Sequence, residues 1–300
     1  MTKSSSLIFF GNERLSTGFL PNGAPTLQRL IDNGYNIAAV AANYEKGTSR
    51  KARKLEIAEV AKRHGIPVLL PEKPAEIYDQ LRSYDAAAGI LVAYGKIIPQ
   101  SIIDIFPHGI LNIHPSLLPE YRGSTPIEQA IIDGKATTGV TIMSLVKAMD
   151  AGPIYTQKEI KLNQKETKQE LSEHLLNIGG ELLLKVLPDI LQNKATPTPQ
   201  DETKASFTKQ IKKQDGIVNW QEPAQLIERK IRAYAEWPKS RTNIFGHDIT
   251  IVKARQAKNE FDGHLVMPCR QGFIEIQEVT APSGRNMDSE AFLRGYKKDR

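Results

Sequence analysis

Cysteine is almost absent from this chain of 300 residues, in which Cys269 is the single example. A lone thiol forms no intramolecular disulfide, and it cannot supply the several thiolates of a thiolate metal cluster. Long apolar runs are absent as well, because no stretch approaches the roughly 18 uninterrupted apolar residues of a transmembrane helix. The apolar run at residues 7–10 is too short for a secretory signal. We therefore expect a cytoplasmic protein with no membrane partner.

A glycine-rich dinucleotide fingerprint is also missing. Residues 12–23, which follow the first apolar run, contain no Gly-x-Gly-x-x-Gly, so a dinucleotide site is not predicted. The formal charge of +6 is unevenly placed, because residues 207–300 hold 17 basic and 12 acidic side chains while residues 1–206 hold 23 and 22. This excess suits a surface that meets phosphate, although it is also common on domains that bind nothing charged.

Apolar strands alternate with helical patterns through the first two thirds of the chain. Apolar runs at residues 37–42 and 86–92 follow the first run, and leucines and isoleucines at helical spacing lie between them. This rhythm predicts an α/β fold with a mainly parallel, Rossmann-like sheet over residues 1–192. Residues 193–206 are polar, contain two prolines and lack periodicity, so we interpret them as a linker. Short alternating segments in residues 207–300 predict a second domain, a small β-barrel.

The stretch from Gly109 to Gly123 holds the densest chemistry in the sequence. Asn112 and His114 are two residues apart in a predicted buried strand, so both side chains leave the same face. Pro115 ends the strand and places the pair at a carboxyl end, where open α/β sheets bind their ligands. The sequence therefore predicts a functional site at this end of the strand.

Two capping boxes are predicted further along the chain. Thr125 suits the N-cap of a short helix, with Glu128 three residues later as its partner. Thr167 and Glu170 have the same spacing before a long amphipathic helix at residues 171–191. Both patterns predict where a helix begins.

The stretch around Asn112 resembles a known signature. It reads Asn-x-His followed by Ser-Leu-Leu-Pro-x-Tyr-Arg-Gly, and Asp150 stands before Gly152, 36 residues after the histidine. This combination is similar to the pattern of the folate-dependent formyltransferases. Without the resemblance, Asp150 would be interpreted as a turn former. The resemblance implies a catalytic group of Asn112, His114 and Asp150, in a Rossmann-like domain that is followed by an OB-like barrel.

These three side chains suit the transfer of a formyl group to an amine. The Asn112 amide can donate to the oxygen on which negative charge develops, and losing such a donor typically costs roughly 2.7–4 kcal/mol. His114 titrates in the range needed to move protons, and Asp150 can orient and polarise its imidazole. A metal site on His114 and Asp150 is the alternative. Because at least three ligands are usual, we expect no metal.

The resemblance also implies a co-substrate, 10-formyltetrahydrofolate. Residues 93–99 are similar to the stretch that lines the folate pterin pocket in the family, and Gly95 suits a close backbone approach. Packing alone would also explain Ile97. The residues predicted to bind the folate are Tyr94, Gly95, Ile97, Ser116, Leu117, Leu118 and Pro119.

A basic cluster follows the second predicted strand and comprises Lys46, Arg50, Lys51, Arg53 and Lys54. Charge runs are commonly solvated loops or helix faces, and that interpretation stays open. Family members that act on methionyl-tRNA carry a basic loop here that enters the acceptor stem, and residues 231–238 resemble the start of their second domain. The resemblance thus implies initiator methionyl-tRNA as the acceptor, and we expect a monomer. A nucleotide-linked aminosugar is the alternative acceptor.

Neutralising Arg50, Lys51, Arg53 and Lys54 together should raise the apparent KM for methionyl-tRNA and leave folate affinity intact. The reason is that the loop is expected to meet phosphates of the acceptor stem, whereas the folate binds elsewhere. Steady-state kinetics with each substrate varied in turn measures both constants. Kinetics identical to those of the wild type would refute the assignment of this loop.

Overall fold

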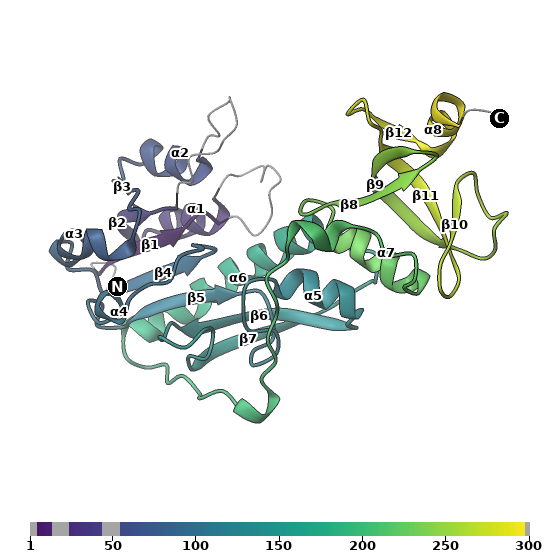
Figure 1. The fold of residues 1–300 in the computed structure, drawn as a ribbon. Coiled ribbons are helices and arrows are strands. Elements are labelled where there is room, and N and C mark those ends of the chain that lie inside the picture. The colour runs from purple at the N-terminus through teal and green to yellow at the C-terminus, as the bar shows by residue number, and fades with distance from the viewer. Residues whose placement is uncertain (1–4, 14–23, 44–54, 298–300) are drawn as a thin grey trace. The chain divides into compact units, whose positions relative to one another are not determined.

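The structure, a computed structural model, describes residues 5–13, 24–43 and 55–297 (Figure 1). The basic cluster from Lys46 to Lys54 lies outside these residues. The chain forms two compact units. The first comprises residues 1–123, 138–160 and 172–207, and the second comprises residues 124–137, 161–171 and 208–300.

The first unit is built around a seven-stranded sheet with the strand order β3-β2-β1-β4-β5-β6-β7. Neighbouring strands from β3 to β5 run parallel, and β6 is antiparallel to β5. The predicted α/β class with a mainly parallel, Rossmann-like sheet is therefore confirmed. The strands are β1 (Ser6–Gly11), β2 (Asn36–Ala41), β3 (Val68–Leu69), β4 (Ala88–Val92), β5 (Ile110–His114), β6 (Thr137–Ser144) and β7 (Ile154–Lys161).

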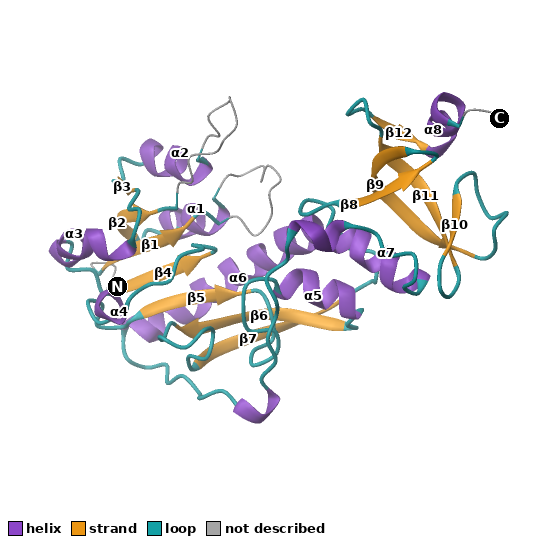
Figure 2. Cartoon of the chain, in the orientation of Figure 1, coloured by secondary structure: helices purple, strands orange, loops and turns teal. Residues whose placement is uncertain are grey.

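Helices connect the parallel strands, as Figure 2 shows. After β3 the chain crosses β1 to form β4, so the strand order reverses direction between β1 and β4. In open α/β sheets, ligands bind at such a switch point, outside the carboxyl ends of the strands. The connecting helices are α1 (Pro25–Asp32), α2 (Glu56–Arg63), α3 (Tyr78–Ser83), which follows a 3₁₀ turn at Pro74–Ile77, and α4 (Gln100–Ile103).

The central strands are buried on both faces. All four side chains from Leu7 to Phe10 have no exposed surface. Phe10 packs edge-on against Tyr94 and Phe106, with ring centroids 5.8 and 6.0 Å apart. Because both faces of these strands are covered, their sequences show unbroken apolar runs rather than an alternation of apolar and polar residues.

The long helix α6 (Lys168–Leu191) packs against β5 and β6 at a glycine. A Cβ on Gly179 would lie 2.4 Å from Ile113 Cγ2 and 3.2 Å from Val140 Cγ1, so a larger residue would push the helix away from the sheet. The predicted capping box is confirmed, because the Thr167 N–H donates to Glu170 Oε2 over 2.8 Å and the Glu170 N–H donates to Thr167 Oγ1 over 3.3 Å. Neither α6 nor any other described helix has the apolar length needed to span a membrane.

The capping box predicted for α5 (Pro126–Asp133) is wrong, although Thr125 is the N-cap residue. The Thr125 hydroxyl donates to the carbonyl oxygen of Lys209 over 2.9 Å. Glu128 is buried, and its Oε1 lies 3.0 Å from Lys168 Nζ. A buried carboxylate needs a partner of opposite charge, so this distant lysine takes the place of the local cap.

The second unit contains a five-stranded antiparallel sheet that curls into a half-barrel, with the path β10-β11-β9-β8 and with β12 paired to β11. The predicted OB-like architecture is confirmed. Buried Ile227, Ile251, Ile274 and Phe292 form its core together with neighbouring apolar side chains. Its elements are α7 (Ala224–Ala233), β8 (Ser240–Ile244), β9 (His247–Ala257), β10 (Val266–Pro268), β11 (Phe273–Thr280), β12 (Asn286–Asp288) and α8 (Ser289–Tyr296).

The buried carboxylate of Glu13 accepts hydrogen bonds from the first backbone N–H groups of α1. Its carboxylate accepts the Thr26 N–H through Oε2 and the Leu27 N–H through Oε1, each over 2.7 Å. The side chain has no exposed surface. This burial raises the pKa of Glu13 to about 7, although the two N–H donors lower it in part.

The contribution of Glu13 to stability should decrease as the pH rises from 4.5 to about 7. In this range the unfolded chain has lost the carboxyl proton while the folded protein keeps it, so the free energy of unfolding falls with pH. The whole change corresponds to ~3 kcal/mol. Urea unfolding of the wild type and of Glu13→Gln across this range measures it.

The stability difference, wild type minus Glu13→Gln, should decrease steadily with pH in that experiment. Glu59→Gln serves as the control, because Glu59 is an exposed carboxylate on α2. A Glu13→Gln difference that is constant across the range would contradict the prediction.

Candidate active site

β5 ends with the two predicted polar residues. Asn112 and His114 are 6% and 4% exposed, and they lie on one face of the strand because successive side chains alternate. Leu91 of β4 and Met143 of β6 lie opposite Asn112, and Thr141 of β6 lies opposite His114. Among the described residues, the Asn112 amide has no hydrogen-bond partner.

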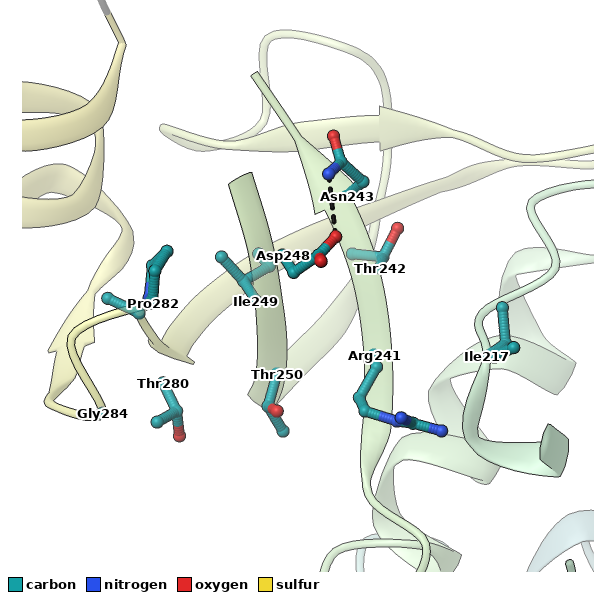
Figure 3. Close-up of a pocket in the computed structure, with 11 residues that line it drawn as sticks. Ile217, Arg241, Thr242, Asn243, Asp248, Ile249, Thr250, Thr280, Pro282 and Gly284 are labelled. Atoms are coloured by element: carbon teal, nitrogen blue, oxygen red, sulfur yellow. Dashed lines mark hydrogen bonds between the residues drawn. The ribbon is translucent and has the colours of Figure 1, made fainter. Parts of the chain in front are cut away.

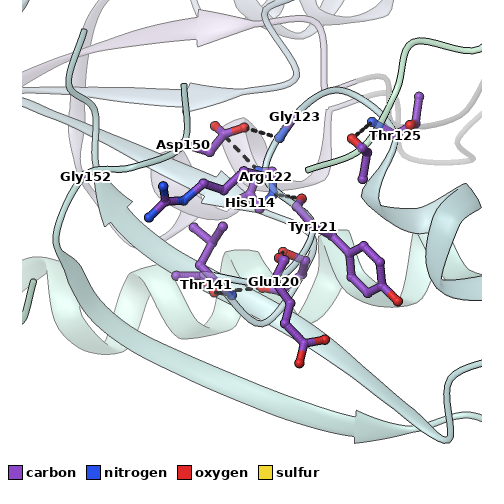
Figure 4. A network of polar contacts seen from close by, with 12 residues as sticks. His114, Glu120, Tyr121, Arg122, Gly123, Thr125, Thr141, Asp150 and Gly152 are labelled. Atoms are coloured by element: carbon purple, nitrogen blue, oxygen red, sulfur yellow. Dashed lines mark hydrogen bonds and ion pairs between the residues drawn. The ribbon is translucent and has the colours of Figure 1, made fainter. Parts of the chain in front are cut away.

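The imidazole of His114 lies between two acceptor groups (Figure 4). Its Nε2 is 3.0 Å from the carbonyl oxygen of Tyr121, and its Nδ1 is 3.7 Å from Asp150 Oδ1. Because a carbonyl oxygen only accepts, we assign the proton of the neutral ring to Nε2. Nδ1 is then the unprotonated nitrogen of the neutral ring, and it faces the Asp150 carboxylate.

Asp150 lies in a tight turn between β6 and β7. Its Oδ2 accepts the Gly123 N–H over 2.8 Å, and its φ of 48° falls in the left-handed region. That region is uncommon for a residue with a Cβ, although aspartate enters it more readily than most. A Cβ on Gly152 would lie 1.8 Å from the Ser144 carbonyl oxygen, so only glycine fits there. The backbone and side-chain contacts together fix the carboxylate beside His114.

Among the described residues, no third metal-ligating side chain lies beside His114 and Asp150. No group of three or more histidine, cysteine, aspartate or glutamate side chains that could hold a metal ion occurs in the part of the chain that the structure describes. An imidazole beside a carboxylate is a pair suited to acid–base chemistry.

A buried hydroxyl holds the loop that follows β5. Thr141 Oγ1 donates to the Ser116 carbonyl oxygen over 2.7 Å and accepts the Leu118 N–H over 3.2 Å. The Gln157 amide donates to Thr141 Oγ1 and to the Leu118 carbonyl oxygen, each over 2.8 Å. Neither Thr141 nor Gln157 is predicted from the sequence, because each occupies an ordinary position in a strand.

The residues predicted to bind folate fall into two groups. Ser116, Leu117, Leu118 and Pro119 form the first turn of the loop, where the buried Ser116 hydroxyl donates to the Glu120 carbonyl oxygen over 2.7 Å. Thr141 and Gln157 therefore set the shape of this group. Whether it binds folate stays a prediction.

The second group, Tyr94, Gly95 and Ile97, follows β4. The Tyr94 side chain is packed in the core, and this burial raises its pKa to about 12. Gly95 has a φ of 73°, and the Ile97 side chain is 85% exposed. Tyr94 thus offers a ligand only its backbone, whereas Ile97 offers an apolar side chain.

Arg122 follows Tyr121 in the same loop, and its charged guanidinium group is buried. Its side chain is 3% exposed, and the guanidinium donates to both carboxylate oxygens of Glu202 over 2.7 and 2.9 Å. These hydrogen bonds raise the pKa of Arg122 and lower the pKa of Glu202. Glu202 belongs to the aperiodic segment 193–206, so the sequence pattern contains no signal for this contact.

A second candidate site is a hollow of about 540 Å³ in the second unit (Figure 3). Arg241 lies in its wall, where Nη2 donates to the Lys213 carbonyl oxygen over 2.7 Å. The Arg241 Nε is buried without a partner among the described residues. Asp248, also in the wall, accepts a hydrogen bond from Asn243 Nδ2 over 2.8 Å. Polar and apolar residues both line this hollow, and among its lining residues Arg241 is the basic one.

An amide, an imidazole and a carboxylate thus lie at the carboxyl ends of the strands of an α/β sheet, an arrangement suited to acid–base chemistry. The sequence profile of formyl transferases matches residues 15–187, and the profile of the formyl transferase C-terminal domain matches residues 210–297. The chain belongs to the formyl transferase family.

Its relatives are similar along most of their length. A methionyl-tRNA formyltransferase from Chloroflexus aurantiacus is 36% identical over 291 residues, which are 91% of this chain and 93% of the relative. One from Pelobacter propionicus is 31% identical over 305 residues, 97% of this chain and 93% of the relative. The structure of an N-formyltransferase from Helicobacter canadensis has a TM-score of 0.67 at 18% identity, over 90% of this chain and 97% of that chain. The predicted family is confirmed.

Proposed function

We propose that the protein transfers the formyl group of 10-formyltetrahydrofolate to the amino group of initiator methionyl-tRNA, giving N-formylmethionyl-tRNA for translation initiation in the cytoplasm. The observation that carries the proposal is the contact of His114 with Asp150 at the end of β5. It occurs in a chain whose relatives, at 31–36% identity, are methionyl-tRNA formyltransferases.

In this proposal, Asn112 stabilises the negative charge that develops on the formyl oxygen as the amine attacks. Its amide is a neutral donor, nearly buried and without a partner among the described residues. A fixed donor in such a site contributes roughly 2.7–4 kcal/mol, because burial strengthens the interaction and the donor needs no reorganisation.

His114 and Asp150 move and hold the proton in this proposal. Formyl transfer requires the attacking amine to lose one proton and the departing nitrogen to gain one, so no net proton is released. Nδ1 of His114 accepts and returns the proton, because the Tyr121 carbonyl oxygen holds Nε2. Asp150 faces Nδ1 at 3.7 Å and stabilises the ring while it carries the charge.

We further propose that Ser116, Leu117, Leu118 and Pro119, together with residues 94–97, bind the folate. When bound, the folate supplies an activated formyl group on its N10 nitrogen. The exposed Ile97 offers apolar surface to a pterin ring, and Gly95 lacks a Cβ that would hinder a close approach.

Methionyl-tRNA is favoured over an aminosugar by the relatives, which share 31–36% identity with this chain. The Helicobacter canadensis structure contains folinic acid and dTDP-3-aminofucose, but it shares only 18% identity with this chain. We propose residues 207–300 as the tRNA-binding domain, with Arg241 as a phosphate contact. The other proposed tRNA contacts lie outside the described residues, and they are Lys46, Arg50, Lys51, Arg53 and Lys54.

An acceptor screen tests the function. The protein is incubated with 10-formyltetrahydrofolate and with charged initiator tRNA, charged elongator tRNA or a nucleotide-linked aminosugar, and the formylated product is measured by mass spectrometry. We expect transfer to methionyl initiator tRNA, with a KM that rises steeply with salt because phosphates are neutralised in the complex. Transfer to the aminosugar alone, or to no acceptor, would overturn the proposal.

His114→Ala and Asp150→Asn should each lower kcat by roughly 10²–10⁴-fold, the usual contribution of a general acid–base group. The melting temperatures should stay close to that of the wild type. His174→Ala is the control, because His174 is an exposed histidine on α6. Near-normal turnover in either active-site variant would contradict the assigned roles.

A further inference from the structure

Residues 198–207 run beside the loop that follows β5 in the first unit. At one end, Thr198 exchanges two backbone hydrogen bonds with Ile154, each over 2.8 Å. At the other end, Phe207 forms a backbone bridge with Arg122, and its ring lies 5.8 Å from the Arg122 guanidinium carbon. Between these ends lie Gln200, Glu202 and Ser206, whose side chains all contact the loop or the Asp150 turn.

Gln200 connects a buried charge to the turn that carries Asp150. Its Oε1 accepts two hydrogen bonds from Arg122, from Nε over 3.1 Å and from Nη2 over 2.8 Å. Its Nε2 donates to the carbonyl oxygens of Asp150 and Gly152, each over 2.7 Å. Both lone pairs and both N–H groups of the side-chain amide are therefore used.

We propose that Gln200 is a positioning residue for formyl transfer, which holds the Asp150 carboxylate at His114 through the backbone of the Asp150 turn. This inference rests on the catalytic role proposed above for Asp150. Arg122 and Glu202 act behind Gln200, because they fix the orientation of its amide.

The chemistry of the contacts requires an amide at this position. The guanidinium of Arg122 only donates, and the two carbonyl oxygens of the turn only accept. A side chain that joins them must therefore present an acceptor on one side and two N–H groups on the other. A glutamate at position 200 would still accept from Arg122, but it would place a carboxylate oxygen against two carbonyl oxygens.

Ser206 holds the backbone of Tyr121, whose carbonyl oxygen is the other contact of the His114 ring. Its Oγ accepts the Tyr121 N–H over 2.8 Å, and its carbonyl oxygen accepts the Arg122 N–H over 2.8 Å. The Ser206 N–H in turn donates to the Pro119 carbonyl oxygen over 3.1 Å. One short segment thus supports both sides of the imidazole, the Tyr121 carbonyl oxygen through Ser206 and the Asp150 carboxylate through Gln200.

Steady-state kinetics of Gln200→Ala and Gln200→Glu tests the proposal. We expect kcat to fall by roughly 100-fold, as for a catalytic group displaced by about 1 Å, with both KM values within about threefold of the wild type. Gln100→Ala is the matched control, because Gln100 is an exposed glutamine whose Nε2 donates to Asp104. Equal losses in kcat and substrate affinity, or unfolding of both Gln200 variants, would make Gln200 a general structural residue and overturn the proposal.

A double-mutant cycle with Asp150→Asn tests whether Gln200 acts through Asp150. If it does, Gln200→Ala changes the residual kcat of Asp150→Asn by less than about threefold, because the group it positions is already lost. Independent effects that multiply would overturn the proposal.

Hydrogen exchange of the Gly123 amide gives a measurement that needs no turnover. This N–H donates to Asp150 Oδ2, so its exchange reports where the carboxylate lies. We expect exchange at Gly123 to accelerate at least about tenfold in Gln200→Ala, while amides of β1 keep their protection. Unchanged exchange at Gly123 in Gln200→Ala would overturn the positioning role. If the wild type showed no formyl transfer but exchange at Gly123 still accelerated in Gln200→Ala, only the proposed function would be contradicted.

Discussion

The hydrogen bond between His114 Nε2 and the Tyr121 carbonyl oxygen is the interaction on which the site depends. A carbonyl oxygen has no proton to give, so this contact decides which ring nitrogen keeps its proton and which one is free to exchange. The free nitrogen is the one that faces Asp150. Without this bond the Asp150 carboxylate, which only accepts, would favour the tautomer with its N–H on Nδ1, and Nδ1 would no longer be the basic nitrogen of the neutral ring.

The fold fixes this bond by satisfying the polar groups of the loop around it. Thr141 and Gln157 hold the loop from the β6 and β7 side, and Ser206 holds it from the segment after α6. Thr141 and Ser206 contact the loop backbone directly. Gln157, an exposed residue of β7, contacts both the Leu118 carbonyl oxygen and the Thr141 hydroxyl. Buried networks of this kind are costly when incomplete, which gives the loop a single well-defined shape.

How far the sequence predicts this structure depends on the range of the interactions. The strand-helix rhythm and the placement of Asn112 and His114 on one face follow from local periodicity, and they are confirmed. The capping pattern at Thr125 and Glu128 is equally local, yet it fails because Lys168 supplies a charge that the pattern cannot contain. Gln200 contacts residues 48 to 78 positions away from a segment without periodicity. No propensity rule applies to such contacts, since they depend on how distant segments are packed.

Arg122 forms its ion pair with Glu202, and the neutral amide of Gln200 connects Arg122 to the backbone of Asp150. This division of contacts has an electrostatic reason. If the guanidinium contacted the Asp150 carboxylate directly, the two would form a strong ion pair, and the carboxylate would be less able to stabilise a protonated His114. Glu202 takes up the charge of Arg122, as the lowered pKa of its carboxyl group indicates. The amide of Gln200 then transmits the rigidity of that pair to the Asp150 turn without a charge of its own. The charge of Arg122 still acts on Asp150 through space, since Asp150 contributes to the raised pKa of Arg122. The hydrogen bonds that hold the Asp150 turn come instead from the neutral Gln200 amide and the Gly123 N–H, so the carboxylate keeps its contact with the imidazole.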